Sequence, residues 1–231
     1  ATQIAFVGGE WRTSLIVEPA DGRLPIRDDY RDLYSEWRDR GLMPAAGPEA
    51  RGVLDRCLSG PAPLPLLTLF YGVVSGNPGG DNPVRNVQIV QTADYVLILG
   101  EYFSQVRIIP LASEFKQDLG PRWMGDSIAS YVGNSLVIQS RNFRAEHSTV
   151  FMRSSTGFEV TETYTRTSAD EILLRYTVVD PVIYSEAVTA EIPLQRMAPG
   201  QYLYEYGCHE GNYSMVSILR GARMEEIGYF R

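Results

Sequence analysis

The sequence is poor in basic residues and contains no long apolar run. Its formal net charge is −7, from 21 Lys and Arg against 28 Asp and Glu, and Lys116 is its only lysine. A chain without a basic cluster has little attraction to a phosphate backbone, so we expect neither nucleic acid nor an anionic membrane surface as a partner. No apolar run approaches the ~20 residues of a membrane-spanning helix, so we expect no membrane insertion.

Metal-binding and cofactor-binding motifs are also absent. The two histidines, His147 and His209, show no HxH or HExxH spacing, so a zinc site would need carboxylates from elsewhere. There is no GxSxG, no GxxxxGK and no GxGxxG after a strand. The glycine-rich stretch at 76–83 opens no helix and carries no lysine. We therefore expect no metal and no cofactor.

Only two cysteines occur, Cys57 and Cys208, and neither belongs to a CxxC motif. In an exported protein such a pair is typical of one disulfide. The bridge would close a loop of about 150 residues and stabilise the fold by roughly 4–5 kcal/mol in the chain-entropy model. The alternative is two buried free thiols. The first residue is Ala, which fits a mature protein after signal-peptide removal or a trimmed chain. We expect a periplasmic or secreted protein.

From residue 86 onward, short β-branched and aromatic segments follow one another with turn signals between them. No segment with a helical period interrupts them, which favours an antiparallel meander over βαβ units. Eight or nine strands in succession favour closure into a barrel, because closure removes unpaired edges. The expected strands are 87–92, 94–103, 106–111, 127–132, 135–143, 158–167, 171–180, 187–196 and 202–208.

The first 85 residues carry different signals. A strand is expected at 14–17, and apolar residues spaced i, i+3, i+4 and i+7 from Tyr30 to Trp37 predict an amphipathic helix. A shorter helix is expected over 48–58. The stretch 59–85 contains five prolines and five glycines around an apolar centre, which predicts a loop draped over the fold near the mouth of a pocket.

We expect one mainly β domain over residues 1–231: an N-terminal strand and helical segment (1–58), the loop (59–85), the barrel (86–210) and a C-terminal segment with a short helix (211–231). Ten motifs span roughly residues 12–223: RTSLIVEPADGRLP, RCLSGP, NVQIVQTADYVLI, RIIPL, WMGDS, GNSLVIQSRNF, VTETYTR, YTVVDP, TAEIP and YEYGCHEGNY. In this order they resemble a family of predicted exported proteins of unknown function from proteobacteria and acidobacteria. The strand pattern is also similar to calycin and lipocalin-like barrels of about eight to ten strands.

The resemblance implies an exported location and supports the disulfide, because both cysteines lie in matching motifs. It implies no reaction and no catalytic residue. The chain departs from the family pattern before VTETYTR, where Glu159 and its neighbours stand in place of an expected histidine. Histidine chemistry at that position is therefore absent.

Strand alternation suggests a polar cluster inside the barrel. Glu162 and Tyr164 share one face of their strand, and if the intervening threonines face water, Glu162 points inward. The same reasoning adds Arg107, Glu101 and Arg141. A buried carboxylate is costly unless it is paired, and arginine is its usual partner. The cluster would bind an anionic group or activate a proton acceptor. The alternative is a structural ion pair that fills the barrel.

The stretch YEYGCHEGNYSM at 204–215 is the strongest catalytic candidate. A histidine titrates near neutral pH, and His209 lies beside Glu210, a combination suited to general acid/base catalysis if the chain turns at Gly211. The alternative is a strand end anchored by the disulfide. A second candidate is RWMGDS, where Trp123 and Asp126 would lie near the loop mouth, although Gly-Asp-Ser is also ordinary turn chemistry.

These patterns predict a cofactor-free acid/base enzyme of the lyase, isomerase or cyclase type, acting on a small hydrophobic or aromatic molecule. Proton transfer would fall to His209, Tyr206 or Tyr213, with Arg107 holding an anionic group and Glu162 orienting or accepting. The predicted ligand contacts are Glu101, Trp123, Asp126, Arg141, Tyr164 and Tyr204. One alternative is a non-catalytic binding or carrier protein. Another is an envelope interaction protein whose barrel is filled by its own side chains.

Overall fold

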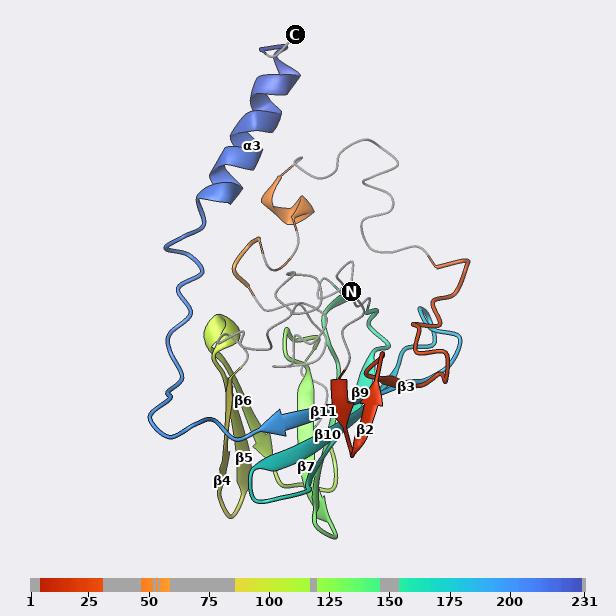
Figure 1. Ribbon diagram of the computed structural model, residues 1–231. Coiled ribbons are helices and arrows are strands. Elements are labelled where there is room, and N and C mark those ends of the chain that lie inside the picture. Colours follow the sequence, from red (N-terminus) through yellow and green to blue (C-terminus); the bar gives the residue numbers. More distant parts are fainter. Residues whose placement is uncertain are drawn as a thin grey trace.

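The computed structural model describes residues 5–30, 47–51, 53, 55–58, 86–116, 120–145 and 154–229. The described chain is mainly β, with antiparallel sheets and one α-helix (Figure 1). Most of the expected amphipathic helix after Tyr30, the loop at 59–85 and His147 lie outside the described residues.

The larger sheet has six antiparallel strands in the order β3-β11-β10-β9-β8-β7. Four of its five neighbouring pairs join strands that are consecutive in sequence, because the chain returns each time beside the strand it has just left. The strands are β3 (Ile16–Glu18), β7 (Asp126–Val132), β8 (Ser135–Arg141), β9 (Glu159–Arg166), β10 (Glu171–Val179) and β11 (Val188–Gln195).

A three-stranded sheet faces the inner side of the larger one. It contains β4 (Val87–Gln91), β5 (Tyr95–Gly100) and β6 (Gln105–Pro110). A parallel bridge between Leu111 and Ala129 links the end of β6 to β7. Arg107 of β6 nevertheless reaches Glu162 of β9, which lies two strands beyond β7 in the sheet order. The chain therefore curls so that both sheets enclose one core.

Burial follows the alternation expected for strands with one face on a core. Along β9, Val160, Glu162 and Tyr164 are buried, while the threonines between them are half-exposed. The predicted inward direction of Glu162 is confirmed. The fully buried apolar side chains around it include Ile98, Ile109, Ile138, Phe143, Phe158, Leu174, Tyr176 and Val178.

The eight strands expected between residues 86 and 196 are present within a few residues of their predicted bounds. The ninth is wrong: residues 202–208 join no sheet in the described structure. Here Tyr204 N–H donates to Glu101 Oε1 and Tyr206 N–H donates to Ser104 Oγ. Side-chain acceptors take these backbone donors in place of a neighbouring strand.

The N-terminal predictions need two corrections. Of the short helix expected over 48–58, the described residues show a 3₁₀ turn, η1 (Pro48–Ala50), and turns at 53 and 55–57. A hairpin of β1 (Ala5–Val7) and β2 (Glu10–Arg12) was missed, although Gly8 and Gly9, both at positive φ, make its turn. The antiparallel β class is confirmed, and closure into a barrel stays a prediction.

The C-terminal helix is confirmed as α3 (Tyr213–Glu226), with Asn212 as its N-cap. Figure 1 shows α3 at one end of the molecule, away from both sheets, and none of its residues is buried. The predicted disulfide is also confirmed: Cys57 and Cys208 are joined at an S–S distance of 2.03 Å across a separation of 151 residues. A disulfide is typical of an oxidising environment. Within the described ranges, no helix is long and apolar enough to cross a membrane.

Candidate functional site

Two groups of charged side chains lie on opposite faces of strands β7 and β8. The first is a buried cluster centred on Arg107 and Glu162, whose side chains are each 1% exposed. Arg107 Nη2 lies 2.7 Å from Glu162 Oε2, and Arg107 Nη1 donates to Glu162 Oε1 at 3.1 Å. Tyr164 Oη donates to the same Oε1 at 2.8 Å. One carboxylate therefore receives a guanidinium and a phenol.

Two hydroxyls complete this buried cluster. Arg107 Nη2 donates to Ser140 Oγ at 3.0 Å and to Ser127 Oγ at 3.3 Å, and the two hydroxyl oxygens lie 2.7 Å apart. Ser127 and Ser140 are cross-strand partners on β7 and β8. The guanidinium thus ties β6 to three strands of the larger sheet.

Burial and charge act in opposite directions on Arg107. Burial lowers the pKa of its guanidinium, but the charge and hydrogen bond of Glu162 outweigh burial, and the pKa is raised above its usual value. Burial also raises the pKa of the Tyr164 phenol well above its ordinary range, and the negative charge of Glu162 adds to the rise. Arg107 is therefore charged and Tyr164 neutral at any physiological pH, which suits an ion pair that holds strands together.

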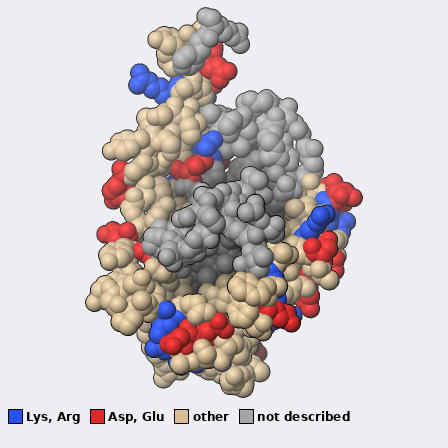
Figure 2. Space-filling model, in the orientation of Figure 1, with Lys and Arg blue, Asp and Glu red and all other residues tan. Residues whose placement is uncertain are grey.

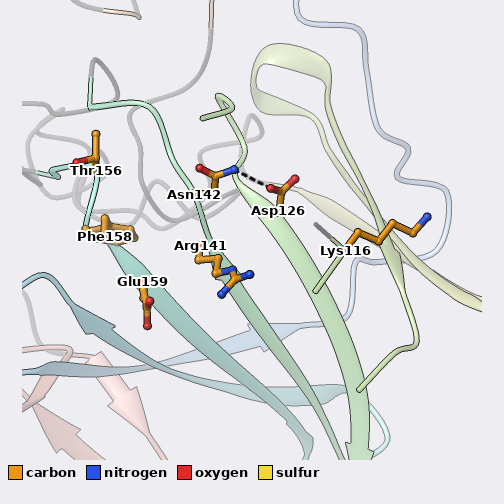
Figure 3. Close-up of a pocket in the computed structure, with 8 residues that line it drawn as sticks. Lys116, Asp126, Arg141, Asn142, Thr156, Phe158 and Glu159 are labelled. Carbon is orange, nitrogen blue, oxygen red and sulfur yellow. Dashed lines mark hydrogen bonds between the residues drawn. The ribbon is translucent and has the colours of Figure 1, made fainter. Parts of the chain in front are cut away.

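The second group lines a cavity of about 270 Å³ on the outer side of the larger sheet (Figure 3). Three of its residues are neighbours across adjacent strands. The pairing register places Asp126 of β7 opposite Arg141 of β8, and the pairing of Ser140 with Val160 puts Arg141 level with Glu159 of β9. The complete lining is Lys116, Asp126, Arg141, Asn142, Thr156, Gly157, Phe158 and Glu159.

Local backbone geometry brings these side chains together. Asn142 adopts a positive φ of 63° immediately after β8, and its Nδ2 donates to Asp126 Oδ2 and to Gly120 O, both at 2.8 Å. Gly125 has a φ of 64°, and a Cβ there would lie 2.6 Å from Arg141 O. Only glycine fits this close approach without strain. The start of β7 is therefore fixed against the end of β8.

The charges of the cavity are only partly neutralised. Asp126 is paired with Arg122 Nη1 at 3.3 Å and with the Asn142 amide. Among the described residues, no ion pair or hydrogen bond involves the side chains of Lys116, Arg141 or Glu159. The Arg141 guanidinium lies over the Phe115 ring, 4.2 Å from its centroid, a cation–π contact that leaves its N–H groups available. Two cations and one carboxylate are thus available to a ligand.

The structure divides the predicted site residues into separate places. It brings Arg107, Glu162 and Tyr164 together in the interior, and Asp126 and Arg141 together at the cavity. Arg141 was expected in the interior, but it is exposed on the outer face, because its neighbour Ser140 takes the inward position.

A different correction applies to Glu101. Glu101 was expected inside by strand alternation, yet the face of β5 that would continue to it is turned outward: Tyr95 is 43% exposed, and Val96 and Ile98 face the core. Glu101 is buried all the same, because the chain leaves β5 after Gly100 and turns into η3 (Tyr102–Ser104). Its carboxylate accepts from Asn86 Nδ2 at 2.9 Å and from Tyr204 N–H.

The residues of the 204–215 stretch do not line the cavity. His209 is exposed in the turn before α3, and Tyr204 and Tyr213 are 68% and 79% exposed. Tyr206 stacks on Phe103, with ring centroids 4.9 Å apart. Trp123 lies under the guanidinium of Arg144 and is not in the cavity lining either. The structure therefore does not bring His209 together with Arg107 and Glu162.

Several lining residues were missed from the sequence. Glu159 was noted only as a substitute for an expected histidine, and Lys116, Asn142, Thr156 and Phe158 were not singled out. One signal was available, because Lys116 is the only lysine of the chain. Asn142 and Phe158 fall at the ends of the predicted strands 135–143 and 158–167 but lie just outside β8 and β9, and Thr156 lies in the segment before β9.

No family model, curated protein or solved structure matches the chain. The resemblance to exported proteins of unknown function therefore stays a prediction. Among the residues described, no three His, Cys, Asp or Glu side chains are grouped so that they could hold a metal ion. On the face drawn in Figure 2, basic side chains lie beside acidic ones.

Proposed function

We propose that this protein is a non-catalytic binding protein of the periplasm or the extracellular space, and that its cavity takes a small anionic molecule. The observation that carries the proposal is that Lys116 and Arg141 line one cavity without an ionic partner among the described residues. A cation without a counter-ion beside a cavity is a ready contact for a carboxylate or phosphate.

The shape and lining of the cavity narrow the ligand further. A volume of about 270 Å³ is slightly below the usual range for ligand pockets, roughly 300–1,000 Å³, which favours a small molecule. Glu159 offers an acceptor to a hydroxyl or ammonium group. This lining suits a polar anion better than the hydrophobic molecule expected from the sequence.

The acid/base enzyme stays a prediction that no feature of the cavity favours. The side chains of Arg107 and Glu162 are each 1% exposed, and each has the other as its partner. A general acid or base must reach the proton that it moves. In the arrangement described, a ligand in the cavity contacts neither residue nor His209.

The single lysine allows a direct test. An amine-reactive ester applied to the folded chain should label only Lys116 and the N-terminal amine, and mass spectrometry resolves the two. Inorganic phosphate, citrate and glutamate would be tested as probes. An anion that occupies the cavity at about ten times its dissociation constant should slow labelling of Lys116 about tenfold by mass action, without changing the N-terminal amine.

Matched variants make this test specific. Arg141→Gln removes the second cation and should abolish the protection. Arg220→Gln is the control, because Arg220 is an exposed arginine on α3 without a described partner. If none of the three anions slows labelling at Lys116, or if Arg141→Gln retains full protection, the proposal is wrong.

The location can be tested independently of the ligand. The Cys57–Cys208 bridge supports an oxidising compartment. Intact-mass measurement of protein taken from cells without reductant, after alkylation, should find no free thiol. Two alkylated cysteines would contradict the proposed location while leaving the cavity proposal open.

A further inference from the structure

Strand β4 forms one edge of the three-stranded sheet. The hydrogen bonds at residues 86 and 92, just before and just after β4, show which of its backbone groups face β5. Thr92 N–H donates to Tyr95 O, and Glu101 N–H donates to Asn86 O. Because backbone groups alternate along an antiparallel strand, the even-numbered residues 88 and 90 bond to β5. The N–H and C=O groups of the odd-numbered residues 87, 89 and 91 point away from the sheet.

No backbone hydrogen bond from another described segment reaches that edge of β4, and the Gln91 side chain donates to Tyr131 Oη of β7 at 2.7 Å. Exposed edges usually carry charges or proline, or are very short, since each feature prevents another strand from pairing there. At the far end of the larger sheet, β3 has these features: it is three residues long, ends in Glu18 and is followed by Pro19. The edge of β4 is five residues long, VQIVQ, with no charge and no proline.

Strand β4 has Ile89 at its centre, with one Val and one Gln on each side of it. A second copy placed antiparallel on a twofold axis through Ile89 would pair Val87 with its partner's Gln91, and Ile89 with its own equivalent. These are the positions whose backbone groups point outward, so three pairs would exchange about six hydrogen bonds. The same patch serves both copies, as an isologous interface requires.

Side chains on the outer face of β4 add to the fit. Val90 lies in register with Leu97 of β5 and Ile108 of β6, and Ile108 is 65% exposed. In the twofold arrangement, Gln88 of one copy lies opposite Val90 of the other. The apolar outer faces of the two three-stranded sheets would then join into one continuous strip. No charged residue lies between Asn86 and Thr92, so nothing on the strand repels its own copy.

We infer that the edge of β4 is a self-association surface, at which two copies of the chain pair β4 with β4 about a twofold axis to form a continuous six-stranded sheet. The contact is a strand addition, in which main-chain hydrogen bonds give affinity and side chains set the register. Its small area makes the dimer a weak one that depends on protein concentration.

The cross-strand pair of residues 88 and 90 provides a test that only this geometry passes. In the double variant Gln88→Lys with Val90→Lys, the lysine at 88 of each copy lies opposite the lysine at 90 of the other. Two such like-charge pairs should abolish strand pairing. Gln88→Lys with Val90→Glu places lysine opposite glutamate twice and should restore it. Both positions are exposed, so neither double variant should disturb the core. Val106→Lys, on the outer face of β6, is the matched control.

Sedimentation equilibrium on the full, oxidised chain from about 1 μM to 1 mM measures the association. We expect the unchanged chain and the Val106→Lys variant to dimerise and the Lys/Lys variant to weaken the dimer at least about tenfold. The Lys/Glu variant should recover most of that loss. Circular dichroism checks that each variant is folded.

Three results would overturn the inference. The unchanged chain could be monomeric up to about 1 mM. A dimer with a dissociation constant above that concentration would be too weak to be a specific contact. A dimer could be insensitive to the Lys/Lys variant, which would place the contact elsewhere. The Lys/Lys variant could also break a dimer that the Lys/Glu variant fails to restore, which would exclude the twofold register about Ile89.

Discussion

On the inner face of strands β7 and β8 the neighbouring charges are buried and paired, whereas on the outer face they line a cavity. On the inner face, Ser127 and Ser140 contact the Arg107–Glu162 ion pair, which is sealed from solvent. On the outer face, the preceding and following residues, Asp126 and Arg141, line an open cavity. Along β8, Ser140 contacts the buried ion pair, and the next residue, Arg141, is a cation without a described ionic partner at the cavity.

This difference teaches which charges are structural and which are available to a ligand. A buried charge must be matched within the protein, because its desolvation costs several kcal/mol. A charge at the rim of a cavity is partly hydrated, so it can stay without a protein partner. Residue type alone does not separate Arg107 from Arg141; burial and pairing do.

The largest expected effect comes from breaking the interior pair. Glu162→Ala leaves the guanidinium of Arg107 buried without its carboxylate, and we expect a loss of about 3–5 kcal/mol in the free energy of unfolding. Urea denaturation would measure it. The double variant Arg107→Leu with Glu162→Leu removes both charges and should be clearly less destabilised. If Glu162→Ala lies within about 0.5 kcal/mol of the unchanged chain, the pair is not structural.

A smaller loss of stability is expected at Gly125, which lies just before β7 and against the end of β8. Gly125→Ala meets both an unfavourable φ of 64° and the nearby Arg141 carbonyl, so we expect a loss of about 2–3 kcal/mol. Gly133→Ala is the control: Gly133 has a φ of 60°, but a Cβ there meets no atom within 4 Å. It should lose only about 1 kcal/mol. Equal losses for the two variants would argue against a tight contact at Arg141.

High pH distinguishes the interior from the surface through tyrosine. Burial raises the pKa of Tyr176 above its usual value of 10.0. Below about pH 10 both folded and unfolded chains keep this proton; above it the unfolded chain releases the proton first. The free energy of unfolding should therefore fall as pH rises, by about 1.4 kcal/mol per pH unit for each such tyrosine.

Between about pH 10 and 11.5, Tyr176→Phe should lessen the fall in the free energy of unfolding by about 1.4 kcal/mol per pH unit. Denaturation at several pH values measures this. Tyr202→Phe is the control, since Tyr202 is 68% exposed. An unchanged slope in Tyr176→Phe would mean that the phenol is hydrated in the folded chain.

The smallest effect on stability is expected at the cavity. Arg141→Gln removes no described ion pair and only an exposed cation–π contact with Phe115, so the free energy of unfolding should fall by about 1 kcal/mol or less. The same substitution should abolish anion protection of Lys116. A loss of stability comparable to that of Glu162→Ala would erase the distinction between the two faces.

Local patterns predicted much of this fold. The period-two alternation of Val160, Glu162 and Tyr164 was enough to place Glu162 inward, because the intervening threonines suit a half-exposed face. The strands between residues 86 and 196 were predicted for the same reason. The pattern failed at 202–208, where aromatic residues alternate as in a strand but the backbone donors bond to Glu101 and Ser104.

The candidate site was only partly predictable. Arg107 and Glu162 were expected to meet, since a buried carboxylate needs a cation. Asp126 and Arg141 were each named, but their contact with one cavity depends on strand register, which a one-residue shift would reverse. Glu159 became part of the site only because β9 lies beside β8 in that register.

The sequence by itself determined the β class, and it predicted the inward direction of Glu162 and the disulfide between the only two cysteines, because each depends on local alternation or on a count. Only the tertiary structure decided which arginine is sealed and which is open to a ligand, and which strand edge is left without a described partner. These features depend on contacts between residues that are far apart in the chain, and no local pattern records them.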